Sequence, residues 1–297
     1  MSDPDRSERP DPSVPTQLRA LFRRYEFRPK KRLGQSFLID GNIARKIARL
    51  AELNHELSVV EIGAGAGAVT QFLAEEAGRV AAVEIDPKLV AILRETAGAS
   101  VQIVEADVLT LDWRQLLGRT RRPWHVVANL PYSITGPALF RLLEAAQAFH
   151  RLVLMLQEEV AERLLAPPGS HARGLLTVLT EACCDIRSAG SVPATCFYPR
   201  PRVRSRLLVL EVRRPPLVPE ALRDTFVSVV KAAFGARRKT LANALSHDQR
   251  LTLPKEETAA VLSQCGIDPK QRAESLSAGE FLRLTQALAR SSGKGAA

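Results

Sequence analysis

The stretch LSVVEIGAGAGAVT, Leu57 to Thr70, decides the fold. Its first six residues have the apolar, β-branched composition of a short buried strand. The glycines at positions 63, 65 and 67 then let the backbone turn sharply into a helix and approach a ligand closely. The N-terminus of that helix supplies unpaired N–H groups, which suits a nucleotide-like ligand. Taken alone, the stretch also fits a tight glycine turn that binds nothing.

Strand-like and helix-length segments alternate after this stretch. The further strands are expected at Arg79–Ile85, Val101–Ala106, Trp124–Asn129 and Arg151–Gln157. Helices are expected at Ala68–Ala77 and Asp86–Ala97, with a weaker helical signal at Asp112–Thr120. Such alternation predicts an α/β fold with a mostly parallel, doubly wound sheet.

The two ends of the chain differ in composition from this alternating region. Residues 1–29 are basic and proline-rich and are predicted to be a disordered tail, apart from a short helix at Thr16–Phe27. Residues 30–213 are predicted to form the sheet domain, whose last strand is Ser205–Arg213. Three prolines in Arg213–Glu220 mark a linker, and residues 214–297 are predicted to form a small C-terminal all-helical domain.

Acidic side chains at the strand ends narrow the choice of ligand. Glu84 can accept hydrogen bonds from both hydroxyls of a ribose, and Asp107 can reach an adenine amino group. A helix N-cap is the alternative for such carboxylates, and Asp86 before Pro87 is predicted to be one. The spacing G-x-G-x-G differs from the dinucleotide fingerprint, and Glu61 suits a cationic nucleoside. We therefore predict S-adenosylmethionine as the ligand.

The stretch VVANLPYSIT, Val126 to Thr135, supplies the chemistry at the end of the fourth strand. The side-chain oxygen of Asn129 and the carbonyl of Leu130 can accept both hydrogens of an adenine amino group, which frees the nitrogen lone pair to attack a methyl group. Pro131 stiffens the loop, and Tyr132 can stack on the base. Such a site works by proximity and fixed dipoles without a general base. As a bare tetrapeptide, NLPY is also compatible with a proline turn carrying a buried tyrosine.

The charge balance favours a polyanionic partner. The chain has 297 residues, with 42 Lys and Arg against 32 Asp and Glu, for a net charge of +10. Three basic clusters are candidates for RNA contact, although each one alone is also compatible with a solvated surface. Arg200, Arg202, Arg204 and Arg206 alternate along the chain, so in a strand they would share one face. The candidate RNA-binding residues are Lys30, Lys31, Arg32, Arg200, Arg202, Arg237, Arg238 and Lys239.

Other classes of protein are disfavoured by the composition. No run approaches the roughly 18 apolar residues of a membrane span, and the polar start is not a secretory signal. The four cysteines lack metal-ligand spacing and are expected to be reduced core residues of a cytoplasmic protein. We expect no metal, no membrane partner and a monomer.

Nine stretches between Lys30 and Ala289 carry a resemblance that their order and spacing make specific. They are KKRLGQSFLID, VEIGAGAGAVT, VEIDPKL, EADVL, NLPYSITGP, MLQEEVAERL, CFYPRPRVRS, AFGARRKTLANAL and GIDPKQRAESLSAGEF. The chain resembles the ribosomal RNA adenine dimethyltransferase family, and most closely its housekeeping branch. That branch uses S-adenosylmethionine to dimethylate two adjacent adenosines near the 3′ end of small-subunit (16S) rRNA during ribosome biogenesis.

The resemblance implies a Rossmann-like methyltransferase sheet and a set of site residues. Contacts to the methyl donor are implied for Gln35, Phe37, Gly63, Glu84, Asp107 and Asn129, and the glycine turn adds Glu61 and Gly65. Tyr132 and Phe197 would sandwich the flipped adenine, and two aromatic faces can offset the cost of unstacking it. A core role is the alternative for Phe197. The implied partner is small-subunit rRNA within the pre-30S subunit.

Three positions depart from the family pattern. The family commonly has proline at the position of Ala64, a basic residue at that of Glu158 and a non-basic one at that of Arg204. The first change should only loosen the turn, whereas the other two bear on RNA contacts. Two other functions stay open: the related large-subunit rRNA methyltransferase of macrolide resistance, which shares NLPY, and a non-catalytic ribosome-assembly factor. The C-terminal motifs disfavour the first, and the intact Asn129, Tyr132 and Glu84 disfavour the second.

Overall fold

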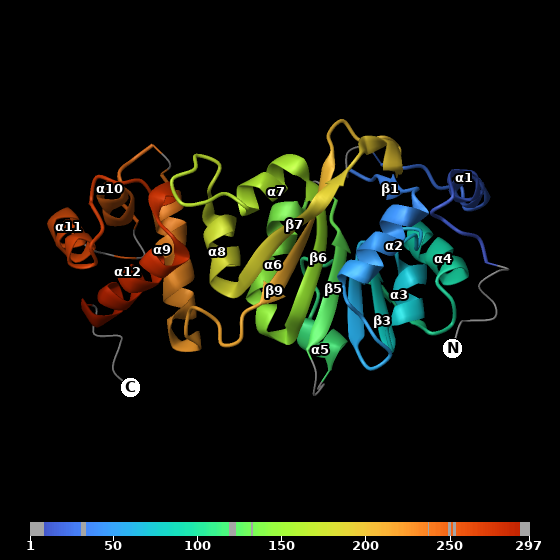
Figure 1. Ribbon diagram of the computed structural model, residues 1–297, viewed down its shortest axis with the longest axis horizontal. Coiled ribbons are helices and arrows are strands. Elements are labelled where there is room, and N and C mark those ends of the chain that lie inside the picture. The colour runs from blue at the N-terminus through green and yellow to red at the C-terminus, as the bar shows by residue number, and fades with distance from the viewer. Residues whose placement is uncertain are drawn as a thin grey trace. The chain divides into compact units, whose positions relative to one another are not determined.

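Seven strands form the central sheet of the computed structural model, in the order β4-β3-β2-β5-β6-β9-β7 (Figure 1). The structure describes residues 9–30, 34–118, 123–131, 133–236, 238–248, 251 and 254–291. The strands are β2 (Ser58–Ile62), β3 (Arg79–Glu84), β4 (Val101–Glu105), β5 (Trp124–Asn129), β6 (Phe149–Gln157), β7 (Cys184–Val192) and β9 (Ser205–Val212). A separate two-stranded sheet pairs β1 (Phe37–Leu38) with β8 (Phe197–Tyr198).

The direction of the strands confirms the predicted mostly parallel, doubly wound sheet. The neighbours from β4 through β3, β2 and β5 to β6 are all parallel, and β9 is antiparallel to β6. The chain leaves β2 toward β3 and β4 on one side and returns to β5 and β6 on the other, so the strand order reverses between β2 and β5. Ile62 aligns with Ala128, which brings the carboxyl ends of these two strands together. Such a reversal is where α/β sheets bind ligands.

Helices join the parallel strands, namely α3 (Thr70–Glu76), α4 (Pro87–Thr96), α5 (Trp113–Leu117) and α6 (Thr135–Glu144). An aspartate caps α4 and α5, whereas no side chain caps α3 or α6. The carboxylate of Asp86 accepts a hydrogen bond from the N–H of Lys88 and Pro87 is the first helical residue, as expected. Asp112 caps α5 in the same way.

The N-terminal region differs from the expected disordered tail wherever it is described. Helix α1 (Pro15–Arg24) forms as predicted, but residues before it are also ordered, and Ser13 is only 4% exposed. Leu18, Leu21 and Phe22 are buried against the sheet unit. Helix α2 (Gly41–Leu50), capped by Asp40, was not expected. Residues 9–14 are mostly polar, so the sequence predicted disorder there. They are ordered because α1, which follows them, packs its apolar face into the first unit.

The chain divides into two compact units: Met1–Ala161 with Ile186–Val212, and Glu162–Asp185 with Arg213–Ala297. The α-helices that end or lie in the second are α7 (Glu158–Leu164), α8 (Leu175–Cys183), α9 (Arg223–Phe234), α10 (Leu241–Ser246), α11 (Lys255–Gln264) and α12 (Ala278–Ser291). Short 3-10 turns lie at Ala146–Ala148, Ala194–Cys196, Glu220–Leu222 and Ala273–Ser275. The segment between β9 and the third of these turns is irregular, as its prolines predict. The assignment of catalysis and RNA binding to separate domains stays a prediction.

Buried apolar side chains from the sheet and its helices form the core of the first unit. All four cysteines are free, but the expectation that they lie in the core is correct only for Cys184 and Cys196, because Cys183 and Cys265 are partly exposed. Across the described residues, no helix is both long and apolar enough to cross a membrane.

Candidate active site

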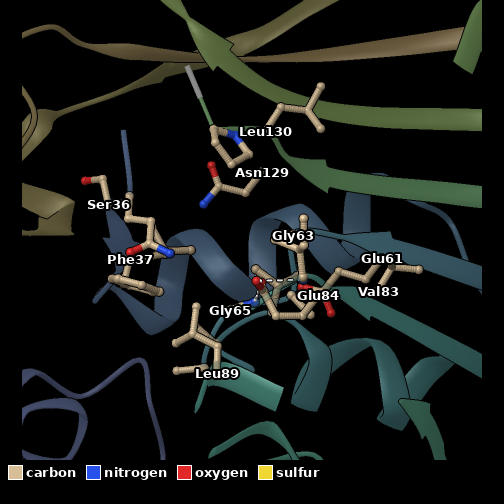
Figure 2. Close-up of a pocket in the computed structure, with 18 of the residues that line it drawn as sticks. Ser36, Phe37, Glu61, Gly63, Gly65, Val83, Glu84, Leu89, Asn129 and Leu130 are labelled. Atoms are coloured by element: carbon tan, nitrogen blue, oxygen red, sulfur yellow. Dashed lines mark hydrogen bonds between the residues drawn. The ribbon is translucent and has the colours of Figure 1, made fainter. Parts of the chain in front are cut away.

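One cavity at the carboxyl ends of β2, β3, β4 and β5 brings together the residues predicted to bind the methyl donor and to act on adenine (Figure 2). It is lined by Gln35, Phe37, Glu61, Gly63, Gly65, Glu84, Asp107, Asn129, Leu130, Pro131 and Phe197. Tyr132, the remaining member of the predicted set, lies outside the described residues. The structure therefore places these side chains where the prediction requires them, and their individual roles stay predictions.

The glycine turn forms one wall of this cavity because two of its members allow close approach. Gly63 and Gly65 have φ angles of +71° and +59°, which disfavour any other residue. A Cβ at Gly63 would lie 3.0 Å from the main-chain oxygen of Asn129, and one at Gly65 would lie 3.3 Å from the ring of Phe37. The turn thus packs directly against the predicted catalytic loop and against β1. Ala64, which departs from the family pattern, is buried in this wall.

Glu84, at the end of β3, holds the glycine turn to the neighbouring strand. Its Oε2 accepts a hydrogen bond of 2.9 Å from the N–H of Gly65, and its Oε1 accepts bonds from the N–H groups of Ile85 and Asp86. Burial raises the pKa of Glu84, while these three N–H groups work against that shift. A carboxylate has about four lone-pair positions, so about one remains for a ligand hydroxyl. A ribose bound through two hydroxyls must share or displace the Gly65 bond.

Glu61 is a fully buried carboxyl group in the wall of the same cavity. Its Oε2 accepts a hydrogen bond from the hydroxyl of Thr70 in the first turn of α3. Burial raises the pKa of Glu61 to about 8, and the nearby Glu84 adds to the effect, whereas the Thr70 bond opposes it. At neutral pH the group is therefore mostly neutral, and a cation in the cavity would favour its ionised form.

A lysine in the N-terminal basic run contacts the site through Asp86. The Nζ of Lys30 lies 2.7 Å from Oδ2 of Asp86, and its N–H donates to Oε1 of Gln35. Burial alone would raise the pKa of Asp86, but the bonds from Lys30 and Lys88 outweigh it and hold the pKa below its usual range. These contacts do not test the predicted RNA role of Lys30, but they show that it is bonded within the protein, to Asp86 and to the cavity-lining Gln35.

Asp107, after β4, lines the cavity and also makes a local turn. Its Oδ1 accepts a hydrogen bond of 2.9 Å from the N–H of Leu109. The bond forms a local turn, whereas the alternative that the sequence left open was a helix N-cap, and the next helix begins only at Trp113. The second carboxylate oxygen remains for an adenine amino group, so the two roles are compatible.

The loop after β5 presents Asn129 to the cavity, and Figure 2 shows its amide directed into the space between Phe37 and the glycine turn. The carbonyl of Pro131 accepts hydrogen bonds of 3.1 Å from the N–H of Ile134 and from the hydroxyl of Thr135. These bonds join the loop to the start of α6. The proline ring and the helix start together restrict where the Leu130 carbonyl can lie.

Phe197 takes the core position that the sequence left open as an alternative, and its predicted stacking on adenine stays a prediction. It is 4% exposed and packs in the hydrophobic core, yet it also lines the cavity. Its backbone pairs with Leu38, and the next residue, Tyr198, pairs with Phe37. This short ladder brings a segment from late in the chain to the mouth of the site formed by the early segments.

The arginine-rich stretch after β8 corrects the expectation of a strand face. Arg200, Arg202 and Arg204 lie in an irregular loop with exposed side chains, and only Arg206 is in β9. Prolines at 199 and 201 prevent the loop from joining the sheet ladder. Glu158, one of the departures from the family pattern, pairs with Arg206 at 2.9 Å. The side chain of Glu158 therefore makes an ion pair within the protein.

The remaining basic candidates divide between described and undescribed positions. Arg238 and Lys239 are exposed in a turn of the second unit. Lys31, Arg32 and Arg237 lie outside the described residues. No described group of His, Cys, Asp and Glu side chains is arranged to hold a metal ion.

The cavity also has lining residues that the sequence analysis missed. Ile85 is 57% exposed, although its neighbours in β3 are buried. Its place directly after Glu84 is a signal that could have identified it. Pro12 and Leu18, from before β1, also line the cavity. Nothing in their local sequence points to a binding role.

Comparison with known proteins agrees with this geometry. Residues 26–290 match the family model described as ribosomal RNA adenine dimethylase. Ribosomal RNA small subunit methyltransferase A of Geobacter sulfurreducens is 46% identical over 264 residues, which cover 88% of this chain and 95% of that protein. The protein of the same name from Shouchella clausii is 41% identical over 283 residues, covering 94% and 96% of the two chains.

Two solved structures are also similar. A dimethyladenosine transferase from Plasmodium falciparum shares the fold, with a TM-score of 0.73 and 23% identity over 86% of this chain and 98% of that one. The 23S rRNA methyltransferase ErmE gives a TM-score of 0.64 with 29% identity, over 85% and 99% of the two chains. Because the family model spans nearly the whole sequence and the relatives match along their full length, this chain belongs to the ribosomal RNA adenine dimethylase family.

Proposed function

We propose that this protein transfers methyl groups from S-adenosylmethionine to N6 of two adjacent adenosines in the 3′-terminal hairpin of small-subunit (16S) rRNA, giving dimethyladenosine. One observation carries the proposal: the cavity at the strand reversal is lined both by residues predicted to bind the methyl donor and by Asn129, Leu130 and Pro131, which are predicted to act on adenine. The relatives named ribosomal RNA small subunit methyltransferase A support the choice of RNA. The substrate is the rRNA of the pre-30S subunit.

The residues present fit the methyl donor. The donor carries a sulfonium whose methyl group is electrophilic, together with an ammonium, a carboxylate, a ribose and an adenine. Glu61 is a buried carboxyl with no described cation beside it, which suits the positive end of this molecule. The glycine turn provides a surface free of side chains, and Glu84 and Asp107 keep acceptor positions for the ribose and the adenine.

The Asn129 loop accounts for the activation of adenine. The adenine N6 lone pair is delocalised into the ring, so the amino group is a weak nucleophile. The side-chain oxygen of Asn129 and the carbonyl of Leu130 accept its two hydrogens and favour a pyramidal nitrogen whose lone pair faces the methyl group. Attack forms the N–C bond while the S–C bond to the methyl group breaks, so the electron pair of that bond stays on sulfur and S-adenosylhomocysteine leaves; the positive nitrogen then loses a proton to water. Fixed dipoles of this kind contribute typically 10²-fold or more to the rate.

Aromatic and basic side chains complete the proposal for RNA. Phe197 and Tyr132 hold the flipped base between their rings, which offsets the free energy lost on unstacking. The exposed Arg200 and Arg202 follow Phe197 closely in the chain and contact the phosphates on either side of the target. The helical C-terminal region adds Arg238 and Lys239. The protein acts as a monomer in the cytoplasm.

Product mapping tests the proposal. Purified protein with labelled S-adenosylmethionine is supplied with unmodified small ribosomal subunits and, separately, with large-subunit RNA. We expect dimethyladenosine at two adjacent positions of the small-subunit 3′-terminal hairpin. Label in large-subunit RNA alone would instead assign the protein to the macrolide-resistance type. Binding to either RNA without transfer would make it a non-catalytic assembly factor.

A further inference from the structure

The segment Asp11–Phe27, called the N-terminal strap here, lies against the donor cavity and contains two residues that line it. Pro12 precedes α1, and Leu18 lies in its first half. Both side chains are buried, and Leu18 is only 1% exposed. Neither belongs to the set of site residues that the sequence motifs identify.

The strap packs onto the walls of the cavity. Leu18 shares one hydrophobic cluster with Ala66 of the glycine turn and with Leu89 of α4, and both of these also line the cavity. The ring of Phe22 lies 5.0 Å from that of Phe37 in an edge-to-face arrangement. The strap therefore continues the apolar surface of the donor site.

A first polar anchor holds the start of the strap to α3, the helix that follows the glycine turn. The Oδ1 of Asp11 accepts a hydrogen bond of 2.7 Å from Nε2 of Gln71, whose side chain is nearly buried. The same oxygen accepts bonds from the N–H and the hydroxyl of Ser13. This cluster fixes the backbone on both sides of Pro12.

A second anchor holds the end of the strap to α4, the helix that follows Glu84. The hydroxyl of Tyr25 donates to Oε2 of Glu95 at 2.8 Å, and Arg24 forms an ion pair with the same carboxylate. The Nζ of Lys88 donates to the carbonyl of Glu26 at 2.8 Å. The strap thus bridges the two helices that follow the two donor-binding strand ends.

We propose that the N-terminal strap is a wall of the methyl-donor site, in which Pro12 and Leu18 contact the half of the donor that faces the glycine turn and slow its dissociation. This inference rests on the proposed function, because it takes the ligand of the cavity to be S-adenosylmethionine. Apolar contact along the strap shields the donor from water on that side. Removal of the contact therefore weakens binding without changing any group that acts on adenine.

A pair of leucines in α1 provides a matched test. Leu18 and Leu21 are in the same helix and the same hydrophobic cluster, and each is 1% exposed, but only Leu18 lines the cavity. The dissociation constant and dissociation rate of S-adenosylhomocysteine, an unreactive ligand, are measured by calorimetry and by competition with labelled donor. We expect Leu18→Ala to raise both by about tenfold. Leu21→Ala should change them by less than about twofold, although it removes the same side chain from the cluster.

A third variant keeps the test decisive if Leu18→Ala does not fold. Asp11→Ala removes the anchor to Gln71 without touching the cavity wall, and it should speed dissociation of S-adenosylhomocysteine several-fold. Wild-type protein that binds S-adenosylhomocysteine, with Leu18→Ala and Asp11→Ala binding it equally well, would overturn the strap proposal alone. Failure of the wild-type protein to bind it would overturn the proposed donor and the strap proposal together.

Discussion

Donor binding should release a proton from Glu61, and the replacement Glu61→Gln should abolish that release. Burial raises the pKa of this carboxyl to about 8 in the ligand-free protein. At pH 7 roughly nine-tenths of the molecules then carry the proton, because the pKa lies about one unit above the pH. If the cationic donor requires the ionised form, binding at pH 7 costs about 1.4 kcal/mol for deprotonation. The affinity should therefore rise about tenfold between pH 7 and a pH well above 8, and fall about tenfold more at pH 6.

Calorimetry in buffers of different ionisation enthalpy measures this release directly. With no RNA present, so that no transfer occurs, we expect the wild-type protein at pH 7 to release about 0.9 more protons per S-adenosylmethionine bound than Glu61→Gln does. The ligand's own amine titrates equally with both proteins, so the difference isolates Glu61. Equal release by the two proteins, with parallel pH profiles from 6 to 9, would refute the reasoning.

The same shift makes a prediction about stability. Because the folded-state pKa of Glu61 lies above the usual carboxyl value of 4.5, the folded protein binds more protons than the unfolded chain between these pH values. The free energy of unfolding of the ligand-free wild-type protein should therefore fall, relative to Glu61→Gln, as the pH rises from about 5 to 8. Urea denaturation of both proteins at several pH values checks the sign, and a constant difference between them would contradict it.

Three further predictions concern other parts of the molecule. Gly63→Ala should destabilise the protein by about 1–2 kcal/mol more than Gly118→Ala in urea denaturation, since both residues have positive φ but only Gly63 faces a close backbone oxygen. Equal losses would exclude that contact as the cause. Arg173→Met should cost about 3 kcal/mol, because Arg173 is 2% exposed and its removal takes a donor from two carbonyls and the charged partner from Glu181, whose carboxylate still accepts the N–H of Ala278. An unchanged midpoint of unfolding, followed by circular dichroism, would contradict this. Joint replacement of Arg200 and Arg202 by glutamine should lower the slope of log affinity against log salt for RNA by about 2, and an unchanged slope would remove them from the interface.

The sheet could be predicted because its strands are short, apolar and separated by turn residues. The predicted bounds of the strand Trp124–Asn129 match the structure at both ends. Each of the other predicted strands differs from the structure by one or two residues at one end. Strand β7, by contrast, has no alternation of buried and exposed residues and contains Gly190. The local sequence therefore contains no strand pattern, and β7 belongs to the sheet only through its pairing with β9.

The candidate site was predictable to the extent that its residues follow strands. Parallel strands bring their carboxyl ends to one edge, so Glu84, Asp107 and Asn129 had to meet near the glycine turn. Pro12 and Leu18 could not be found in this way, since they reach the cavity through tertiary packing of α1. The alternation of arginines from 200 to 206 wrongly predicted a strand face. The prolines at 199 and 201 keep Arg200, Arg202 and Arg204 out of the sheet ladder.

Some contacts lie beyond any local pattern. The ion pair between Lys30 and Asp86 joins residues 56 positions apart, and it assigns a structural task to a lysine that charge alone marked for RNA. The bond between Arg206 and Glu158 similarly depends on the antiparallel pairing of β6 with β9. Tertiary packing brings both pairs together, and no pattern in a single sequence predicts it.

The most direct test of the central claim is the single-turnover rate of methyl transfer to small ribosomal subunits by the Asn129→Ala variant. Asn129, at the end of β5, is proposed to activate adenine in addition to its implied contact with the donor. We expect the rate at saturating donor to fall by about 10²-fold or more, a larger factor than the change in the dissociation constant of S-adenosylhomocysteine, which is measured separately. A variant that transfers methyl groups at the wild-type rate would contradict the assignment of catalysis to this loop.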